Sequence, residues 1–136
     1  MISKYMAKKK VIDCIKFDSV IESKYYEKLK KDVADGIIKN FDLQPQFELQ
    51  PKFTDGITKY RAIIYKADFR VYLNSGVEIV IDIKGMATPE AKLKRKLYNY
   101  KHSSVKWIVW YRSCWMDYDD ALKIKKERKK ARLCKS

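Results

Sequence analysis

Apolar residues along the chain recur at two spacings, and each spacing predicts a different kind of element. In residues 19–35 they recur at every fourth position, which is typical of one face of a helix: Ile21, Tyr25, Leu29 and Val33. Ser19 and Glu22 have the S-x-x-E form of a capping box at the start of this segment, and Gly36 supplies a stop. The pattern therefore predicts a helix from about Ser19 to Asp35.

The pattern changes to β-prone stretches in the next fifty residues. Residues 37–51 contain the near-repeat Leu43-Gln44-Pro45 and Leu49-Gln50-Pro51, and proline at both positions favours an edge strand or an irregular hairpin arm. The turn-like Thr54-Asp55-Gly56 leads into a long β-rich segment, residues 60–73, which Asn74-Ser75-Gly76 closes tightly. This region predicts consecutive, antiparallel strands.

Strict alternation marks residues 77–84 as the next strand. Ile79, Ile81 and Ile83 fall on one face, and Glu78, Val80, Asp82 and Lys84 fall on the other. A second helix opens at Thr88-Pro89-Glu90, with Leu93, Leu97 and Tyr100 as its expected inner stripe. Residues 105–111 form another apolar strand, and residues 117–133 form a final, very basic helix whose apolar stripe fades early. The order α-β-β-β-α-β-α predicts an α/β fold with a central mixed sheet flanked by helices.

Length and composition limit the class of protein. A chain of 136 residues with 46% hydrophobic content can bury one core, so we expect one domain with a basic N-terminal arm (residues 1–10) and a basic C-terminal helix and tail (residues 117–136). The apolar runs are far shorter than the ~20 residues of a membrane span, and the start lacks a signal-peptide stretch, so we expect no membrane association and a cytoplasmic location. Three cysteines without a CxxC pair fit a reduced compartment.

Basic residues outnumber acidic ones by 31 to 17, and the formal net charge of +14 favours a polyanionic partner, nucleic acid first. The excess lies in the tails, since residues 123–136 hold eight basic residues and one acid. A solvated solubility segment is the alternative for such a tail. The candidate DNA-binding residues are Lys92, Lys94, Arg95 and Lys96 in the second helix, and Lys125, Lys126, Arg128, Lys129 and Lys130 in the last.

Candidate chemistry depends on carboxylates and lysines, because His102 is the only histidine and falls in a polar connection. Asp82 and Lys84 share a strand face, and Asp68 precedes Asp82 by 14 residues across the tight turn. If the register permits, Asp68 and Asp82 meet on adjacent antiparallel strands, where their repulsion would be relieved by Mg²⁺ or Mn²⁺. Lys84 would then orient a water or stabilise charge on a scissile phosphate. The alternative is a pair of solvated acids with Lys84 as a salt-bridge partner.

This arrangement resembles the PD-(D/E)XK nuclease superfamily over residues 17–111. The resemblance assigns Glu22 as the helix-borne acid, Asp68 as the motif aspartate and Asp82 and Lys84 as the (D/E)-x-K pair, although Ala67 stands where the superfamily name has proline. From the residues alone, Glu22 is a helix-capping residue. Gln44 could bind the nucleophilic water or a phosphate, or be an ordinary turn residue.

Five short stretches also resemble a family of small phage-encoded proteins regarded as Holliday-junction-resolvase-like endonucleases: Phe17-Asp18-Ser19, Leu43-Gln44-Pro45, Ala67-Asp68-Phe69-Arg70-Val71, Asp82-Ile83-Lys84-Gly85 and Thr88-Pro89-Glu90. The resemblance implies a restriction-endonuclease-like core, a metal-dependent DNA endonuclease and branched DNA such as four-way junctions as its substrate. For a phage-encoded protein the location would be the host cytoplasm. Two symmetric cuts need two sites, so we expect a homodimer.

Three other functions remain open at this stage. A restriction-type or nicking endonuclease would use the same residues on a different DNA. A non-catalytic DNA- or RNA-binding protein would use the basic tails, with the acids as a relic or a structural salt bridge. An adaptor would dock its basic tail on an acidic protein.

Overall fold

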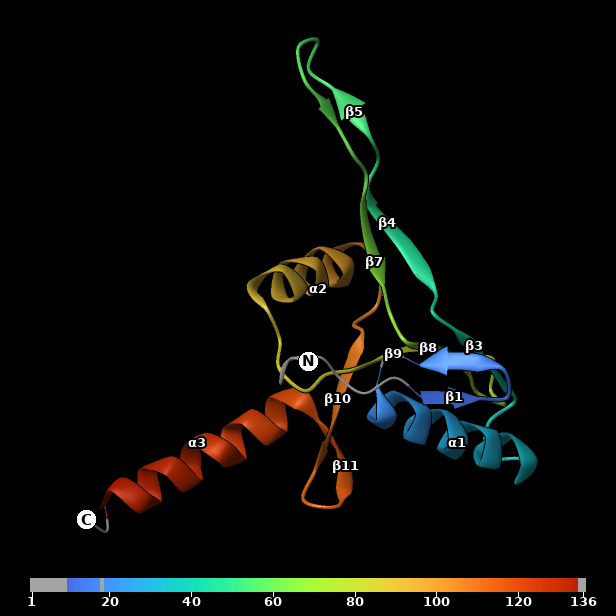
Figure 1. The fold of residues 1–136 in the computed structure, drawn as a ribbon, viewed down its shortest axis with the longest axis vertical. Helices are drawn as coiled ribbons and strands as arrows, with labels where there is room; N and C mark the ends of the chain where they lie inside the picture. The colour runs from blue at the N-terminus through green and yellow to red at the C-terminus, as the bar shows by residue number, and fades with distance from the viewer. Residues whose placement is uncertain (1–9, 18, 135–136) are drawn as a thin grey trace.

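A five-stranded mixed sheet forms the centre of the computed structural model, which describes residues 10–17 and 19–134 (Figure 1). Its strands, in the order β11-β10-β9-β8-β3, are Cys114–Asp117, Lys106–Tyr111, Glu78–Ile83, Phe69–Tyr72 and Asn40–Leu43. Strands β9 and β10 are parallel and the other neighbours are antiparallel. A parallel pair needs a crossover connection, and helix α2 (Pro89–Lys101) supplies it.

Helices cover both faces of this sheet. Helix α1 (Val20–Ala34) packs Tyr25 and Leu29 on one face, against Phe69 of β8. Helices α2 and α3 (Tyr118–Cys134) pack on the other face, where Trp107 of β10 is only 2% exposed. The predicted α/β class, with a central mixed sheet flanked by three helices, is confirmed.

The predicted helix starts are confirmed by their caps. The hydroxyl of Ser19 accepts a hydrogen bond from the N–H of Glu22 at 3.1 Å, and that of Thr88 accepts one from the N–H of Ala91 at 3.1 Å. The carboxylate of Asp117 accepts hydrogen bonds from the N–H groups of the next turn, so it precedes α3 as its cap. These side chains supply hydrogen-bond acceptors to the first N–H groups of each helix, which have no carbonyl acceptor within the helix.

The inner stripe predicted for α2 is wrong. Leu93 and Tyr100 are 56% and 90% exposed, whereas Tyr98 is 2% exposed and packs in the core. Leu97 only borders that core. The buried face of α2 is displaced from the apolar stripe because the strands beside it place Phe47 and Tyr65 against Tyr98, so aromatic contacts decide which face is buried.

Two hairpins were not predicted from the sequence. Strands β1 (Lys10–Ile12) and β2 (Ile15–Phe17) are joined by Asp13 and Cys14, and β10 is joined to β11 by Arg112 and Ser113. All four turn residues have positive φ, between 53° and 64°. Such two-residue turns ordinarily carry Asn-Gly or Asp-Gly, and because that signature is absent here, neither hairpin was predicted.

A long hairpin, residues 46–66, projects from the sheet (Figure 1). Its base pairs β4 (Gln46–Gln50) with β7 (Ile63–Lys66), and its outer part pairs β5 (Phe53–Thr54) with β6 (Lys59–Tyr60). The sequence predicted one β-rich segment over residues 60–73. The structure divides it into β6, β7 and β8, because the chain turns from the hairpin into the sheet at Ala67 and Asp68.

The predictions for the N-terminal arm, for membrane spans and for the cysteines compare with the structure as follows. Nearly all of the basic N-terminal arm lies outside the described residues, as does Asp18. Within residues 10–17 and 19–134, no helix is both long and apolar enough to cross a membrane. Cys14, Cys114 and Cys134 are free thiols at exposed positions.

Candidate functional site

The register of β8 and β9 brings the two predicted aspartates together. Phe69 pairs with Ile81 in this antiparallel ladder. Asp68, which precedes Phe69, therefore lies opposite Asp82, which follows Ile81. The N–H of Asp68 donates to the carbonyl of Ile81 at 3.2 Å, and the Asp68 carboxylate accepts a hydrogen bond of 2.7 Å from the N–H of Ile83. Asp68 was predicted inside a strand, but it lies just before β8, where its side chain can turn toward Asp82.

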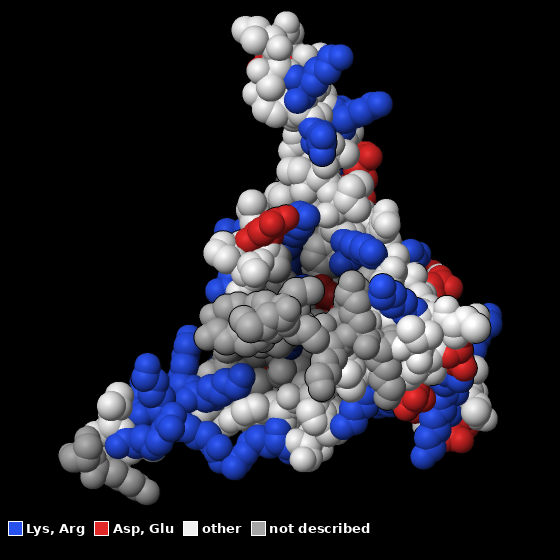
Figure 2. Space-filling view, in the orientation of Figure 1, with Lys and Arg blue, Asp and Glu red and all other residues white. Residues whose placement is uncertain are grey.

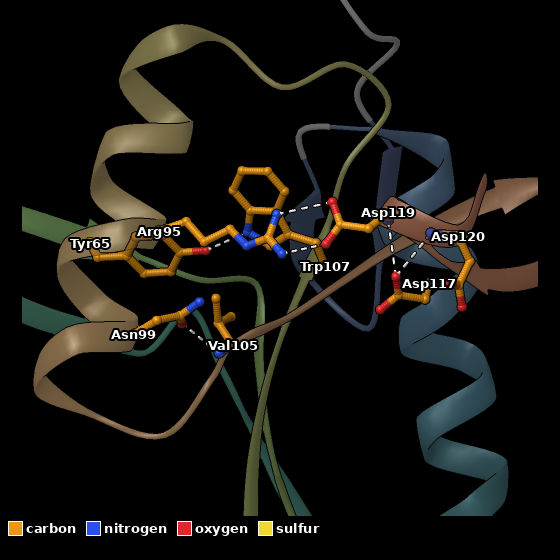
Figure 3. Close-up of polar contacts among 8 residues, drawn as sticks. All are labelled: Tyr65, Arg95, Asn99, Val105, Trp107, Asp117, Asp119 and Asp120. Carbon is orange, nitrogen blue, oxygen red and sulfur yellow. Dashed lines mark hydrogen bonds and ion pairs between the residues drawn. The ribbon is translucent and has the colours of Figure 1, made fainter. Parts of the chain in front are cut away.

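Asp82 is the most enclosed charged group of the site, with 4% of its surface exposed. Its Oδ2 atom accepts a hydrogen bond of 2.8 Å from the hydroxyl of Tyr65 and lies 3.1 Å from Nζ of Lys84. The Tyr65 hydroxyl in turn accepts a bond of 2.9 Å from the indole N–H of Trp107, a pair that Figure 3 shows. The carboxylate of Asp82 is therefore held in one orientation by a chain of buried donors.

The carboxyl group of Asp68 is strongly perturbed by its surroundings. Burial raises the pKa of Asp68 to about 9, helped by its hydrogen bond with Asp82 and by the negative charges of Asp82 and Glu22, while the N–H of Ile83 acts in the opposite direction. Burial and the charge of Asp82 likewise raise the pKa of Tyr65. At neutral pH the pair of aspartates holds a proton unless a cation neutralises it.

Glu22 lies at the same end of the central sheet as Asp68. Both line a cavity of about 80 Å³, together with Gln44 and Phe17. Glu22 also borders a second cavity with Lys84 and Gly85. The capping box put Glu22 in the first turn of α1, and this turn faces the carboxyl end of β9. The structure therefore brings Glu22, Asp68, Asp82 and Lys84 to one end of the sheet. The residues alone indicated the meeting of Asp68 with Asp82, and only the family resemblance added Glu22.

Gln44 joins the site through its backbone. Its N–H donates to the carbonyl of Asp68 at 2.8 Å, and its φ of 50° reverses the chain between β3 and β4. The structure thus makes Gln44 a turn residue, and it also places Gln44 on the wall of the cavity that holds Asp68. Both of the sequence interpretations are compatible with this position.

A third cavity opens on the other side of Asp82. Asp82 and Lys84 line it with Lys94, which was predicted as a DNA-binding residue, and with two residues that the sequence did not indicate, Tyr65 and Lys66. Nζ of Lys94 also lies 3.1 Å from Oε1 of Glu90. Tyr65 and Lys66 come from β7 and not from the D-x-K strand, so only a predicted contact between β7 and β9 could have found them.

The predicted DNA-binding residues of α2 separate into two groups. Lys92 and Lys96 are exposed, whereas Lys94 is half-buried and lines the cavity beside Asp82. Arg95 forms an ion pair with Asp119 of α3, and its guanidinium lies 4.4 Å from the centre of the Trp107 ring (Figure 3). Arg95 thereby connects α2 to α3. In α3, by contrast, Lys125, Lys126, Arg128, Lys129 and Lys130 are all exposed.

The donor set fits a hard divalent cation held by few protein ligands. Asp68 and Asp82 supply two adjacent carboxylates, which suits Mg²⁺ because this ion keeps several waters. Among the described residues, no three Asp, Glu, His or Cys side chains gather closely enough to form a ready-made metal site. Glu22 therefore contributes its charge to the site, and its role as a direct ligand stays a prediction.

The fold and this site define an α/β protein with a paired-carboxylate and lysine centre at the end of a mixed sheet. The chain belongs to the family described as "protein of unknown function (DUF1064)", whose model matches residues 2–118. The matched range includes all four predicted site residues and ends at the first residue of α3. Comparisons with curated proteins and with solved structures find no match.

Proposed function

We propose that this protein is a metal-dependent DNA endonuclease that hydrolyses phosphodiester bonds. The observation that carries the proposal is the burial of Asp68 against Asp82, with Glu22 nearby and Lys84 paired with Asp82. A structural salt bridge needs one carboxylate and one cation. Here a second carboxyl group is held against the first, at a cost that a bound divalent cation would remove.

Each residue has a role in this reaction. Asp68 and Asp82 would hold Mg²⁺ or Mn²⁺, and the ion supplies Lewis-acid polarisation of the phosphate and a more acidic water. Tyr65 and Trp107 keep the Asp82 carboxylate in place. Lys84 borders the cavities on both sides, so its ammonium can stabilise negative charge that develops on the phosphate oxygens.

The substrate class follows from the charge on the surface. Figure 2 shows basic side chains gathered along α3, which extends from the body of the protein, and on the long hairpin. Beyond Ile124 every described residue of α3 is exposed, so these charges are accessible to a partner. A face of this kind binds the phosphate backbone without reading its sequence.

Neutralising two charges of α3 weakens DNA binding in a salt-dependent way. For Lys126→Gln with Lys129→Gln we expect the slope of log affinity against log salt to fall by about 2, since each lost phosphate contact removes ~0.9. Titration of labelled duplex DNA with full-length protein at several salt concentrations measures this slope. Lys31→Gln with Lys39→Gln removes the same charge from exposed positions at the end of α1 and beyond it, and we expect the slope to stay unchanged. Equal slopes for both double variants would exclude α3 as the DNA-binding face.

Branched DNA is the proposed substrate and a homodimer the proposed assembly, both on the family resemblance. The full-length protein, incubated with labelled four-way-junction, flap and linear duplex DNA, should cut the junction in Mg²⁺ or Mn²⁺ and leave all three intact in EDTA. Paired cuts near the branch would support a resolvase. Cuts confined to linear duplex would favour a restriction-type or nicking enzyme.

The basic surface of α3 favours a second candidate, a non-catalytic nucleic-acid-binding protein. Such a protein loses affinity steeply with salt and is indifferent to Mg²⁺. Binding without cuts under every metal would therefore replace the nuclease proposal with this one. If the protein fails to bind nucleic acid even at low salt, the remaining candidate function is an adaptor that docks its basic tail on an acidic protein.

A further inference from the structure

The outer half of the long hairpin is exposed on all sides. At its base Leu49 and Tyr65 are buried, and Phe47 packs on Tyr98 of α2 with ring centres 4.9 Å apart. Every residue from Pro51 to Arg61 is exposed. This half of the hairpin contributes nothing to the two core clusters, so its sequence is not explained by folding of the body.

The tip of the hairpin is nevertheless built in one conformation. Phe53 and Tyr60 stack across the strands, with ring centres 4.6 Å apart and planes 15° from parallel. The Asp55 carboxylate accepts hydrogen bonds from the N–H groups of Ile57 and Thr58 at 2.8 and 2.7 Å, and from the Tyr60 hydroxyl at 3.3 Å. These contacts present Ile57, which is 94% exposed, at the end of the hairpin.

The flanks of this apolar tip are basic. Lys52, Lys59 and Arg61 are all exposed, and Figure 2 shows blue side chains along this projection. The single acid near them, Asp55, turns its carboxylate to the backbone of its own turn. An apolar side chain between cations fits DNA, in which stacked bases lie between two rows of phosphates. Proteins that kink DNA insert such apolar side chains between base steps.

The hairpin is continuous with the candidate active site. Its strand β7 carries Tyr65 and Lys66, which line the cavity beside Asp82. Eight residues separate Tyr65 from Ile57, a reach of at most about 26 Å at ~3.3 Å per residue. That reach corresponds to about eight nucleotides at ~3.4 Å along one strand. DNA whose phosphate lay at Asp82 would therefore extend to the tip of the hairpin.

We propose that the long hairpin is a DNA-binding wedge: Lys52, Lys59 and Arg61 contact phosphates, and Ile57 inserts between bases at a branch point or an opened base step. This inference rests on the proposed action on DNA, but not on cleavage. It gives the protein a physical means to prefer branched DNA, because unstacking costs least where the bases are already unpaired.

The test measures binding and unstacking in EDTA, where no strand is cut. Full-length wild-type protein, Ile57→Ser and the control Val77→Ser are titrated into four-way junctions that carry 2-aminopurine at the branch point. Val77 is also an exposed apolar turn residue, 55% exposed, but it lies outside the hairpin. We expect wild type and Val77→Ser to raise the fluorescence, and Ile57→Ser to lose that rise and bind about tenfold more weakly, as for loss of one buried aliphatic side chain.

The remaining results distinguish failure of the wedge from failure of the nuclease proposal. Equal affinity and fluorescence for wild type and Ile57→Ser would exclude the wedge, even if metal-dependent cleavage were observed. A dimer that Ile57→Ser converts to a monomer, with DNA binding unchanged, would assign the tip to a second copy of the chain. A fluorescence rise that depends on Ile57, in a protein that never cuts, would support the wedge and remove the nuclease. No DNA binding by wild type would overturn both.

Discussion

We expect Asp82→Asn to abolish the proposed metal-dependent cleavage, with a loss of at least about 10³-fold in the single-turnover rate, because one proposed ligand of the ion and the partner of Lys84 are lost together. Asparagine keeps an oxygen that can accept from the Tyr65 hydroxyl, so the buried network and the fold survive. Affinity for four-way-junction DNA in EDTA should change little, since the basic surfaces are intact. Cleavage of labelled junction by excess enzyme, with binding measured on the same preparation, checks both expectations.

Two further variants make this result specific. Asp35→Asn removes an exposed carboxylate at the end of α1 and should cleave at the wild-type rate. Lys84→Met keeps the aliphatic stem beside Trp107 but removes the charge, and we expect a loss of about 10²-fold or more, as for removal of one stabilising group. Wild-type cleavage by Asp82→Asn would end the assignment of the site.

The second large effect is on stability. Since the pKa of Asp68 is raised to about 9 in the folded protein from an ordinary value of 3.8, the folded state holds more protons than the unfolded state between these two values. Stability of the metal-free protein must therefore fall as pH rises through this window. Asp68→Asn removes this dependence, and we expect its free energy of unfolding to exceed that of wild type by about 2 kcal/mol at pH 8.

Denaturant unfolding in EDTA at pH values from 4 to 8 measures this effect as the difference between variant and wild type. The difference should be small at pH 4 and grow with pH, while Asp35→Asn should show no such growth. Mg²⁺ at pH 8 should stabilise wild type more than Asp68→Asn, because a ligand of the folded state shifts unfolding by mass action. A pH-independent difference between Asp68→Asn and wild type would show that the Asp68 carboxyl is not perturbed by its neighbours.

Local patterns predicted the strand that carries the D-x-K residues. Alternation put Ile79, Ile81 and Ile83 on the face that packs on α1, and it put Asp82 and Lys84 together on the other. The turn before this strand made its pairing with β8 antiparallel, and from that pairing the meeting of Asp68 and Asp82 followed. The caps at Ser19 and Thr88 were equally local, which is why the helix starts were predicted closely.

Features that depend on contacts between distant segments were missed. Tyr65 and Lys66 reach Asp82 only because the hairpin base packs beside β9 and β10, and no spacing in the chain reveals this. The inner face of α2 was predicted from its leucines, but the structure buries Tyr98 because aromatic partners from β4 and β7 surround it. Arg95 was predicted on a DNA-binding face, and its partner Asp119 comes from a different helix.

The sequence by itself determined which residues carry charge, which faces of the strand that carries Asp82 are apolar and polar, and where helices begin. It also determined that Asp82 and Lys84 share one face of that strand. These properties depend on neighbours within a few residues, whose geometry the backbone period sets. Only the tertiary structure decided how deeply Asp82 is buried, which groups orient it, that Glu22 borders the cavity, and that an apolar tip projects beyond the body. Burial and electrostatic coupling depend on everything that surrounds a group in space, and that surrounding comes from all parts of the chain.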